Sequence, residues 1–383
     1  MRLAVYTDYT YHRSGTEVYA ERAFAIFLAR LRPAFERLVV LGRFSPPGGH
    51  ARYPLGDVDF VELPFYPRLS QPLRAAPALL RSIRPFWRSL DEVDCVWVLG
   101  PHLLAIVFAL LAAVRGKRVV LGVRQDLPAY VQSRHPGRRA LHAMAWALEG
   151  AFRVLARVFP TIVVGPDLAW RYRRARRLLE ISVSLITEAE VAAAADAPAR
   201  DYSGELRILS VGRIDAEKNP LLLADVLSEL NRGERRWRLA VCGEGDLEDA
   251  LAARLAELGQ SDRSELLGYV PFGEALRRKY LDSHILLHSS WTEGLPQVLF
   301  EAFAATLPVV AADVGGIRAA VGEAAMLVPP GDREATTRAV ASVARDAPVR
   351  ENLVAAGLAY ARSRTSEREL GRLAGFLDGA RHR

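Results

Sequence analysis

From Leu206 onward the sequence repeats one unit, which consists of a short apolar run, a loop, and a stretch with apolar residues at helical spacing. The first copy reads LRILSVG, then GRIDAEKNP, then LLLADVLSEL, and further copies begin at WRLAVCGEG, SELLGYV, HILLHSS and LPVVAADV. Short apolar runs bounded by turn residues are typical of buried strands, and strands that alternate with helices form a parallel sheet. The front half shows the same alternation less regularly, in RLAVYTDY, FERLVVLG, DCVWVLG, KRVVLGV and TIVVGP. The sequence therefore predicts an α/β protein.

The length predicts two domains, since 383 residues exceed what one hydrophobic core usually holds. Residues 187–204 are rich in alanine and turn formers and contain no strand pattern, so we interpret them as the linker region. We predict a first domain over residues 1–187, a linker over 188–204 and a second domain over 205–383, whose last helix is able to pack back on the first domain. Both domains should be Rossmann-like, doubly wound parallel sheets that face each other across a cleft. Open sheets of this kind bind ligands beyond the carboxyl ends of their strands.

The composition is that of a soluble globular protein, with 50% hydrophobic and 25% charged residues. Cys95 and Cys242 lie inside apolar runs, which favours neither a disulfide framework nor a cysteine metal site and indicates a reducing compartment. The N-terminus lacks the pattern of a signal peptide, and the longest apolar run, Leu103 to Val114, is too short to span a bilayer. We therefore expect a cytoplasmic protein, in which this run forms a buried helix.

The net charge of +7 comes from arginine, because only three of the 51 basic residues are lysines. A basic surface attracts phosphates, on nucleotides or on anionic lipids. Nucleic acid is not an expected partner, because the sequence has no recognised nucleic-acid motif. Residues Arg68 to Leu90 interleave arginines with Leu, Ile, Phe and Trp, as a helix lying on an anionic membrane at the inner face would. The alternative is an arginine-rich helix pair that covers the first domain.

The stretch SSWTEGLPQVLFEAF follows the expected strand HILLHSS and carries two acids, Glu293 and Glu301. Pro296 suits the first turn of a helix, where its missing N–H costs nothing. The backbone amides around this helix N-terminus are those of Gly294, Leu295, Gln297 and Val298. The dipole and the unpaired donors of such a terminus favour a phosphate, and Gly294 lets it come close. Each acid can accept hydrogen bonds from hydroxyl groups.

A second loop, GRIDAEKNP, follows another expected strand and supplies Arg213 and Lys218. Two fixed cations can neutralise the charge that grows on a diphosphate when a glycosyl bond breaks, and they would take the place of a metal ion. A nucleotide-diphosphate sugar would contact all of these groups. Its diphosphate would bind the two cations and the helix amides, its ribose one of the two acids, and its sugar the other acid. The alternative is that both cations are solvated turn residues and that Glu301 faces water.

These two motifs together resemble the retaining glycosyltransferases of the GT-B fold, specifically glycosyltransferase family 4, the glycosyl transferases group 1. The resemblance covers nearly all of Leu206 to Asp332, and more weakly the front half. It implies that Glu293 contacts the transferred sugar, that Glu301 binds the ribose, and that Arg213 and Lys218 bind the diphosphate. It also implies catalytic roles for Glu293, Arg213 and Lys218.

The same resemblance places the base-binding region in CGEGDL and LLGYVP. The residues concerned are Gly243, Glu244, and Tyr269 or Val270. CGEGDLE also comes close to a dinucleotide-binding fingerprint, but Glu248 stands where the last glycine belongs. A dehydrogenase is therefore disfavoured.

In the front half, the sequence Ser-Gly-Thr-Glu at 14–17 resembles the family's glycine-rich loop between the first strand and the first helix, which we expect at VYAERAFAIFLARL. Gly15 would then approach the donor phosphate. The family often has a His-Asp pair where this chain has Gln125 and Asp126. Asp126 is the candidate acceptor-side catalytic residue and would hold a hydroxyl of the acceptor or donor, or it caps the turn that follows. The histidines at 12, 102 and 135 are expected at the surface, because their spacing forms no metal cluster.

The resemblance implies that a hexosyl group moves, with retention, from a nucleotide-diphosphate sugar to a hydroxyl of a glycan or lipid-linked acceptor, without cofactor or metal. The pathway would be polysaccharide, glycolipid or capsule synthesis. Three alternatives stay open: a hydrolase with Glu293 and Glu301 as its acid pair, an inactive nucleotide-sugar binding protein, and a nucleotide-sugar epimerase. The helix N-terminus, which favours an anion between the acids, speaks against the hydrolase.

Overall fold

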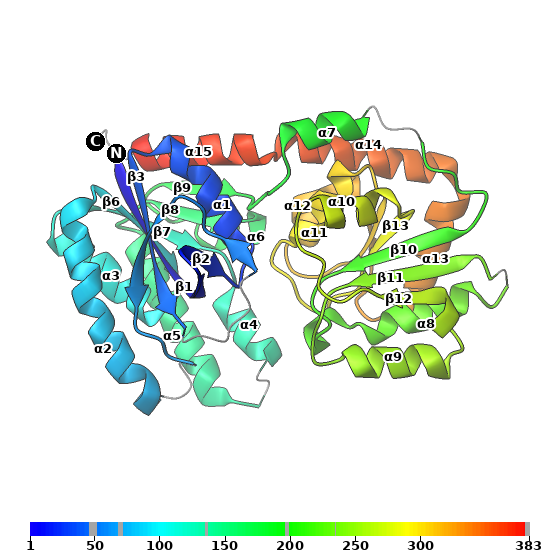
Figure 1. Cartoon of the computed structure of the whole chain (residues 1–383), viewed down its shortest axis with the longest axis horizontal. Helices are drawn as coiled ribbons and strands as arrows, with labels where there is room; N and C mark the ends of the chain where they lie inside the picture. Colours follow the sequence, from blue (N-terminus) through cyan, green and yellow to red (C-terminus); the bar gives the residue numbers. More distant parts are fainter. Residues whose placement is uncertain (46–51, 68–71, 135–136, 196–198, 234, 380–383) are drawn as a thin grey trace. The chain divides into compact units, whose positions relative to one another are not determined.

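The chain is described by a computed structural model that covers residues 1–45, 52–67, 72–134, 137–195, 199–233 and 235–379. It divides into two compact units (Figure 1). The first unit comprises Met1–Val183 and Arg368–Arg383, and the second comprises Ser184–Glu367. Among the described residues, none of the helices is long and apolar enough to cross a membrane.

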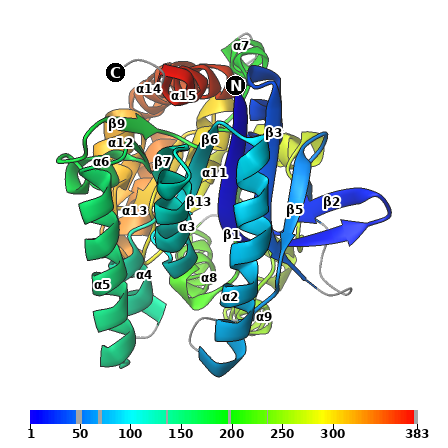
Figure 2. The same cartoon turned by 90° about the vertical axis from the view of Figure 1, so that its left-hand side faces the viewer.

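The first unit is built on a sheet whose parallel strands run in the order β5-β3-β1-β6-β7-β8-β9. The strands are β1 (Arg2–Ser14), β3 (Arg37–Phe44), β5 (Asp59–Leu63), β6 (Cys95–Gly100), β7 (Arg118–Val123), β8 (Thr161–Val164) and β9 (Leu178–Ile181). Its helices are α1 (Phe24–Leu31), α2 (Pro72–Ser89), α3 (Leu103–Val114), α4 (Leu127–Arg134), α5 (Arg139–Ala156) and α6 (Pro166–Arg171). Figure 2 shows α2, α3 and α5 over one face of this sheet. The strand order reverses between β1 and β6, so this sheet has a topological switch point there.

The start of the first unit differs from the sequence prediction. Residues 18–20, expected to open the first helix, belong instead to strand β2 (Glu17–Ala20), which pairs antiparallel with the end of β1 and with β4 (Tyr53–Pro54). Gly15, with φ +61°, stands in the two-residue hairpin turn that joins β1 to β2. A two-residue hairpin turn needs such positive φ values, and the β-formers Val18 and Tyr19 favour the strand that follows. The first helix therefore begins only at Phe24.

The second unit holds a six-stranded sheet in the order β12-β11-β10-β13-β14-β15, in which every pairing is parallel. The strands are β10 (Leu206–Val211), β11 (Trp237–Cys242), β12 (Ser264–Leu266), β13 (Ile285–His288), β14 (Val309–Ala312) and β15 (Met326–Val328). The helices are α7 (Glu188–Ala195), α8 (Leu221–Leu230), α9 (Glu248–Glu257), α10 (Glu274–Leu281), α11 (Gln297–Ala304), α12 (Ile317–Val321), α13 (Arg333–Arg345) and α14 (Ala347–Ser363). The order reverses between β10 and β13, which marks the point where Rossmann-like sheets bind ligands.

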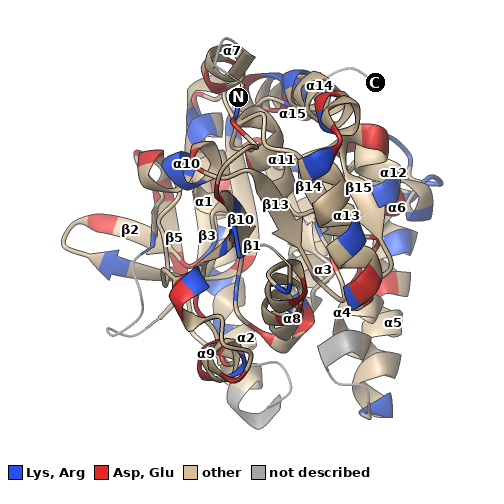
Figure 3. Cartoon of the chain, turned by 90° about the vertical axis from the view of Figure 1, so that its right-hand side faces the viewer, with Lys and Arg blue, Asp and Glu red and all other residues tan. Residues whose placement is uncertain are grey.

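Both faces of the second sheet are covered, because neighbouring strand residues point into two different cores. Leu209 and Leu286 belong to the core beneath α10 and α11, whereas Ile208 and Leu287 belong to the core beneath α8, α9 and α13. Figure 3 shows α8 and α13 in front of the strands. A parallel sheet buried on both faces explains why most of its strand residues are apolar. The predicted fold class, two Rossmann-like parallel sheets, is confirmed.

The predicted linker at 188–204 differs from the observed boundary, which lies between residues 183 and 184. Within that stretch, α7 is part of the second unit, and its Val191 is buried in the core beneath α10 and α11. The alanine-rich sequence is therefore a packed helix. The chain returns to the first unit through α15 (Ser366–Asp378), where Glu369 accepts a hydrogen bond from the Ser182 amide at 2.9 Å and Arg372 donates one to the Glu180 carbonyl at 2.8 Å.

Candidate functional site

The two sequence motifs with candidate site residues lie at the carboxyl ends of β10 and β13, on the two sides of the switch point. The chain after β10 forms a helical turn at Ala216–Lys218, and the chain after β13 leads into α11. Two hydrogen bonds tie these loops together. The Ser289 hydroxyl donates to the Lys218 carbonyl at 2.9 Å, and the Trp291 amide donates to the Glu217 carbonyl at 2.8 Å. The motifs, 75 residues apart at Lys218 and Glu293, thus form one site.

Glu293 is held at the centre of this site by three side chains. Its Oε1 accepts a hydrogen bond from Ser290 Oγ at 2.8 Å, lies 3.0 Å from His288 Nε2, and pairs with the Lys218 ammonium. Only 11% of the Glu293 side chain is exposed. The contacts all fall on one carboxylate oxygen, so the other oxygen makes none of these three and can receive a ligand hydroxyl.

The surroundings of Glu293 keep it ionised. Burial by itself would raise the pKa of this carboxyl, but the hydrogen bond with His288 and the charge of Lys218 outweigh burial and lower the pKa to about 2. A carboxylate of this kind cannot donate a proton near neutral pH. It can accept hydrogen bonds and stabilise positive charge that develops beside it.

Arg213 lies at the rim of the same site, with 41% of its side chain exposed. Its guanidinium pairs with Asp215 and Glu217, both in its own loop. Arg213 and Lys218 line one small pocket together with His288. Both sequence-predicted cations are therefore at the switch point, although each one is paired with carboxylates.

Two glycines allow the loops to approach closely. A Cβ on Gly243 would lie 1.7 Å from the Gly212 carbonyl oxygen, which fixes the loop after β11 against the loop after β10. A Cβ on Gly315, whose φ is +55°, would lie 2.0 Å from the carbonyl oxygen of Glu293. Gly315, in the stretch ADVGG, was not singled out from the sequence. The signal that could have found it is the pair of glycines that follows an apolar strand. Each glycine is required by backbone contact.

The candidate base-binding residues lie in the loops after β11 and β12. Glu244 Oε1 accepts a hydrogen bond from the Tyr269 amide at 3.3 Å, so these two candidates are in contact. Val270 packs against the core beneath α10 and α11. The structure brings these candidates to the same edge of the sheet as Arg213, because the Ile214 amide donates to the Glu244 carbonyl at 2.9 Å.

The start of α11 differs slightly from the prediction. Pro296 is the residue before the helix, with φ −73° and ψ 128°, and Gln297 opens the first turn. The proline side chain has no acceptor, so it leaves the first-turn amides without a side-chain cap. Leu295 packs against the core, while Gly294 precedes it in the loop. This terminus retains the donors expected of an anion site.

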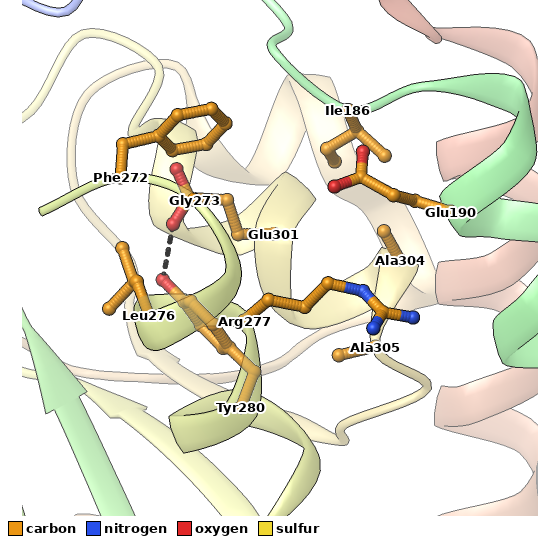
Figure 4. Close-up of a pocket in the computed structure, with 10 residues that line it drawn as sticks. All are labelled: Ile186, Glu190, Phe272, Gly273, Leu276, Arg277, Tyr280, Glu301, Ala304 and Ala305. Carbon is orange, nitrogen blue, oxygen red and sulfur yellow. Dashed lines mark hydrogen bonds between the residues drawn. The ribbon is translucent and has the colours of Figure 1, made fainter.

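Glu301 lines a pocket whose lining residues do not include Glu293 (Figure 4). Its carboxylate accepts a hydrogen bond from the Tyr280 hydroxyl at 2.7 Å. The remaining residues that line this pocket are Ile186, Glu190, Phe272, Gly273, Leu276, Arg277, Ala304 and Ala305. Burial raises the pKa of Glu301 to about 7, with Tyr280 acting in the opposite direction and Glu190 adding to the rise. The alternative, in which Glu301 merely faces water, is disfavoured because its carboxylate is hydrogen-bonded within the protein.

Asp126 performs the structural role that the sequence left open. Its Oδ1 accepts a hydrogen bond from the Ala129 amide at 3.2 Å in the first turn of α4, and its Oδ2 pairs with Arg171 at 2.7 Å. The other front-half candidate, Gly15, stands in the β1–β2 hairpin turn rather than in a strand-to-helix loop.

Sequence reasoning missed a polar cluster at the switch point of the first unit, centred on Asp8. The Asp8 carboxylate accepts a hydrogen bond from the Tyr66 hydroxyl, lies 3.2 Å from Arg43 Nε, and lies 3.3 Å from His102 Nε2. His102 Nδ1 accepts a hydrogen bond from the Leu104 amide at 3.2 Å, so Nε2 carries the hydrogen of the neutral ring, and its hydrogen-bond partner is the Tyr66 hydroxyl at 3.1 Å.

The histidine expectation was wrong at two positions. His102 and His12 are each only 6% exposed, and His12 lies 3.1 Å from a carboxylate oxygen of Glu21. His135 lies outside the described residues. Asp8 keeps 32% of its side chain exposed and accepts a hydrogen bond from the Tyr66 hydroxyl, so its carboxylate also has room to accept one from a ligand hydroxyl group.

Comparison with known proteins finds a family match within the second unit. Residues 194–359 match the family model for glycosyl transferases group 1. The amylovoran biosynthesis glycosyltransferase AmsK of Erwinia amylovora is 33% identical over 139 residues, which are 34% of this chain and 34% of that protein. O-antigen chain mannosyltransferase B of Escherichia coli is 30% identical over 156 residues, 40% of this chain and 41% of that protein. The matches thus span well under half the length of these curated relatives.

Solved structures match the whole chain at low sequence identity. Sucrose-phosphate synthase from Thermosynechococcus elongatus gives a TM-score of 0.72 at 18% identity and covers 99% of both chains. Anabaena HepE in complex with UDP gives 0.70 at 15% identity, over 99% of this chain and 100% of that chain. At such identities the likeness shows the fold alone. The chain therefore has the GT-B fold, and its residues 194–359 match the glycosyl transferases group 1 family.

Proposed function

We propose that this protein is a retaining glycosyltransferase that moves a hexosyl group from a nucleotide-diphosphate sugar to a hydroxyl of a glycan or lipid-linked acceptor. The observation that carries the proposal is the state of Glu293. Lys218, His288 and Ser290 hold this buried carboxylate ionised at the switch point of the second sheet. A fixed negative charge there suits a sugar whose anomeric carbon becomes positive as its bond to phosphate breaks.

The donor diphosphate binds between Arg213, Lys218 and the first-turn amides of α11. The Lys218 ammonium has three hydrogens, and its contact with Glu293 uses one, so two are left for phosphate oxygens. Arg213 is exposed enough to turn from its loop carboxylates toward a diphosphate. These groups supply the positive charge that a metal ion would otherwise supply, so the transfer needs no metal and no cofactor.

The rest of the donor occupies the neighbouring loops. Glu301 accepts hydrogen bonds from the ribose, and Gly243, Glu244, Tyr269 and Val270 form the base site. Gly15 approaches the phosphate from the β1–β2 turn. The two carboxylates therefore contact different parts of the donor and differ in charge. Glu293, at the sugar, is ionised, whereas the pKa of Glu301, at the ribose, is raised to about 7.

The transfer step follows from these charges. The bond between the anomeric carbon and the phosphate oxygen breaks, and the acceptor oxygen bonds to that carbon from the same face. The acceptor's proton passes to the departing phosphate oxygen. Glu293 accepts hydrogen bonds from the sugar and stabilises its positive charge. We propose that Asp126 binds a hydroxyl of the acceptor or donor. Its two carboxylate oxygens have lone pairs that the contacts with Ala129 and Arg171 do not use.

The hydrolase alternative loses support from the same geometry. A glycosidase needs its protonated acid and its carboxylate on either side of one bond. The pKa values of Glu301 and Glu293 would suit those two roles, but Glu293 is not among the residues that line the pocket of Glu301.

The names of similar proteins support the acceptor class. Relatives include amylovoran biosynthesis and O-antigen transferases, and one from Campylobacter jejuni whose name describes an undecaprenol-linked glycan acceptor. Solved complexes of HepE contain UDP and UDP-glucose. We therefore place the protein in polysaccharide, glycolipid or capsule synthesis, in the cytoplasm at the inner face of the membrane.

The test uses slow donor hydrolysis, which needs no acceptor. The protein is incubated with UDP-, GDP-, ADP- and TDP-sugars, and proton NMR follows the released nucleotide and the first-formed anomer. We expect one donor to release its diphosphate with an α-anomeric sugar, and Glu293→Gln to abolish this. A changed sugar still attached to its nucleotide would identify an epimerase, binding without turnover would identify an inactive binding protein, and a β-anomer would refute retention.

A further inference from the structure

The outer surface of the first unit formed by α3, α5 and α6 is unusually apolar. Eleven large hydrophobic side chains are exposed among the described residues, and eight of them lie on these helices or directly after α5. They are Leu103, Leu110, Val114, Met144, Trp146, Val154, Val158 and Trp170. We call this surface the α3–α5–α6 face. Trp146 and Trp170 are 58% and 66% exposed, far beyond what a packed core tryptophan shows.

The pattern within α5 shows that its exposed apolar residues are not displaced core residues. The helix already buries a complete side, which includes Phe152 and Ala156. Trp146 and Val154, eight residues apart, lie on the opposite, solvent side. The helix α3 is divided in the same way, with Phe108 buried and Leu110 exposed, so the prediction that its apolar run is a buried helix holds for one side only.

Arginines surround these apolar residues. Between residues 138 and 177 the sequence has nine arginines and only two acids, Glu149 and Asp167. Glu149 is buried, with 1% exposure. A cavity of about 270 Å³ at this surface has four arginines in its lining, and these are Arg153, Arg157, Arg171 and Arg174. The cavity also joins α5 to α6, so the two helices contribute to one surface (Figure 2).

Three of the four arginines that line this cavity are available to a partner. Arg171 pairs with Asp126, but in the described part of the chain Arg153, Arg157 and Arg174 have no carboxylate within ion-pair distance. Arg173 lies with its guanidinium 4.1 Å from the ring centre of Trp170, which keeps a cation beside an exposed aromatic ring.

We propose that the α3–α5–α6 face docks on an anionic lipid bilayer. Exposed tryptophans and aliphatic residues insert at the headgroup boundary, and the arginines bind lipid phosphates, as on helices that lie in a membrane surface. Charge decides between a bilayer and a second copy of the chain. Two copies that meet symmetrically through this face would bring its arginines against each other, whereas an anionic bilayer complements them.

The sequence directed attention instead to Arg68–Leu90, and the structure favours the other interpretation of that stretch. The residues before α2 lie outside the described part. In the described portion of α2, Phe86 is buried in the core, Trp87 packs against it, and Leu80 is the exposed large apolar residue. This helix therefore covers the sheet with its apolar side and presents arginines such as Arg81 and Arg84 to solvent.

Vesicle sedimentation of the full-length protein tests the proposal. The vesicles contain equal parts of phosphatidylglycerol and phosphatidylcholine, or phosphatidylcholine alone. The docking variant is Arg153→Gln/Arg157→Gln/Arg174→Gln. The matched control, Arg81→Gln/Arg84→Gln/Arg88→Gln, removes the same charge from α2 of the same unit. Binding to an anionic surface falls about fivefold per lost cation, so we expect the docking variant to lose about 100-fold in partitioning and the control to lose far less.

A second variant, Trp146→Ser/Trp170→Ser, separates insertion from charge attraction. Wild-type binding to anionic vesicles should retain a salt-resistant part, which this variant loses. The proposal is overturned if the wild type does not bind anionic vesicles, if it binds both vesicle types equally, or if the α2 control loses as much as the docking variant. It is also overturned if the face instead mediates self-association that the docking variant abolishes in light scattering.

The inference goes beyond the proposed transfer reaction and does not depend on it. Nucleotide binding measured on the same variants separates the two. Vesicle binding without nucleotide binding would support membrane docking and contradict the proposed function. Nucleotide binding without vesicle binding would support the proposed function and contradict membrane docking.

Discussion

Replacing Glu301 by glutamine should make the protein more stable at neutral and alkaline pH while weakening its donor site. Burial raises the pKa of Glu301 from 4.5 to about 7. Between these values the folded state holds a proton that the unfolded state has released, so the stability contributed by this group falls as pH rises. The shift corresponds to about 3 kcal/mol in total, of which about 2.5 kcal/mol is lost between pH 5 and pH 8. Glutamine is nearly isosteric and does not titrate.

The assay is urea unfolding of wild type and Glu301→Gln at pH 5, 6, 7 and 8. Only the difference between the two proteins is used, because other groups titrate in both. We expect the variant to gain about 2.5 kcal/mol relative to wild type from pH 5 to pH 8, or roughly 5–10 °C in apparent Tm of the second unit. Tyr280→Phe should move the wild-type transition to higher pH, since the Tyr280 hydrogen bond lowers the pKa of Glu301. A difference that stays constant with pH would refute the reasoning.

Three further predictions concern the site around Glu293. Gly315→Ala should destabilise the second unit by about 2 kcal/mol or more, because alanine disfavours positive φ and its Cβ would meet the Glu293 carbonyl; thermal unfolding measures this, and an unchanged Tm would contradict the close approach. Lys218→Met should weaken nucleotide-diphosphate binding more than tenfold, since it removes a phosphate ligand and leaves Glu293 without its cation; Lys279→Met, which removes the same charge from α10, is the control in calorimetric titration, and equal effects would count against the site. Removing divalent metal with EDTA should leave donor turnover unchanged, and a loss that Mg²⁺ restores would show that Arg213 and Lys218 do not replace a metal.

The second unit could be predicted well from sequence because its strands are buried on both faces. The run around Leu209 is mostly apolar, and the loops that follow such strands carry their polar residues at one edge. Arg213, Lys218 and Glu293 could therefore be assigned to one site before their contacts were known. The ion pair of Lys218 with Glu293 was not predictable, since nothing in either loop specifies which charged groups meet.

The first unit was harder to predict from sequence, because the pairing of distant strands decided its secondary structure where the local sequence pattern suggested a helix. Val18 and Tyr19 have apolar and aromatic side chains that fit either a helix or a strand, and their pairing with β1 decided for a strand. His102 looked like a loop residue, because a sequence does not show that Asp8 and Tyr66 converge on it. Burial that depends on distant partners leaves no local signal.

A thermal-shift panel with UDP, GDP, ADP and TDP tests the central claim, a nucleotide-sugar site at the switch point of the second sheet, most directly. A ligand that binds only the folded state stabilises it by about 2.7 kcal/mol at a hundredfold excess over its Kd. We expect one nucleotide to raise the Tm of the wild type, and Arg213→Ala and Glu301→Ala each to reduce that rise. If no nucleotide raises the Tm, or if both variants respond as the wild type does, the site proposed here is contradicted.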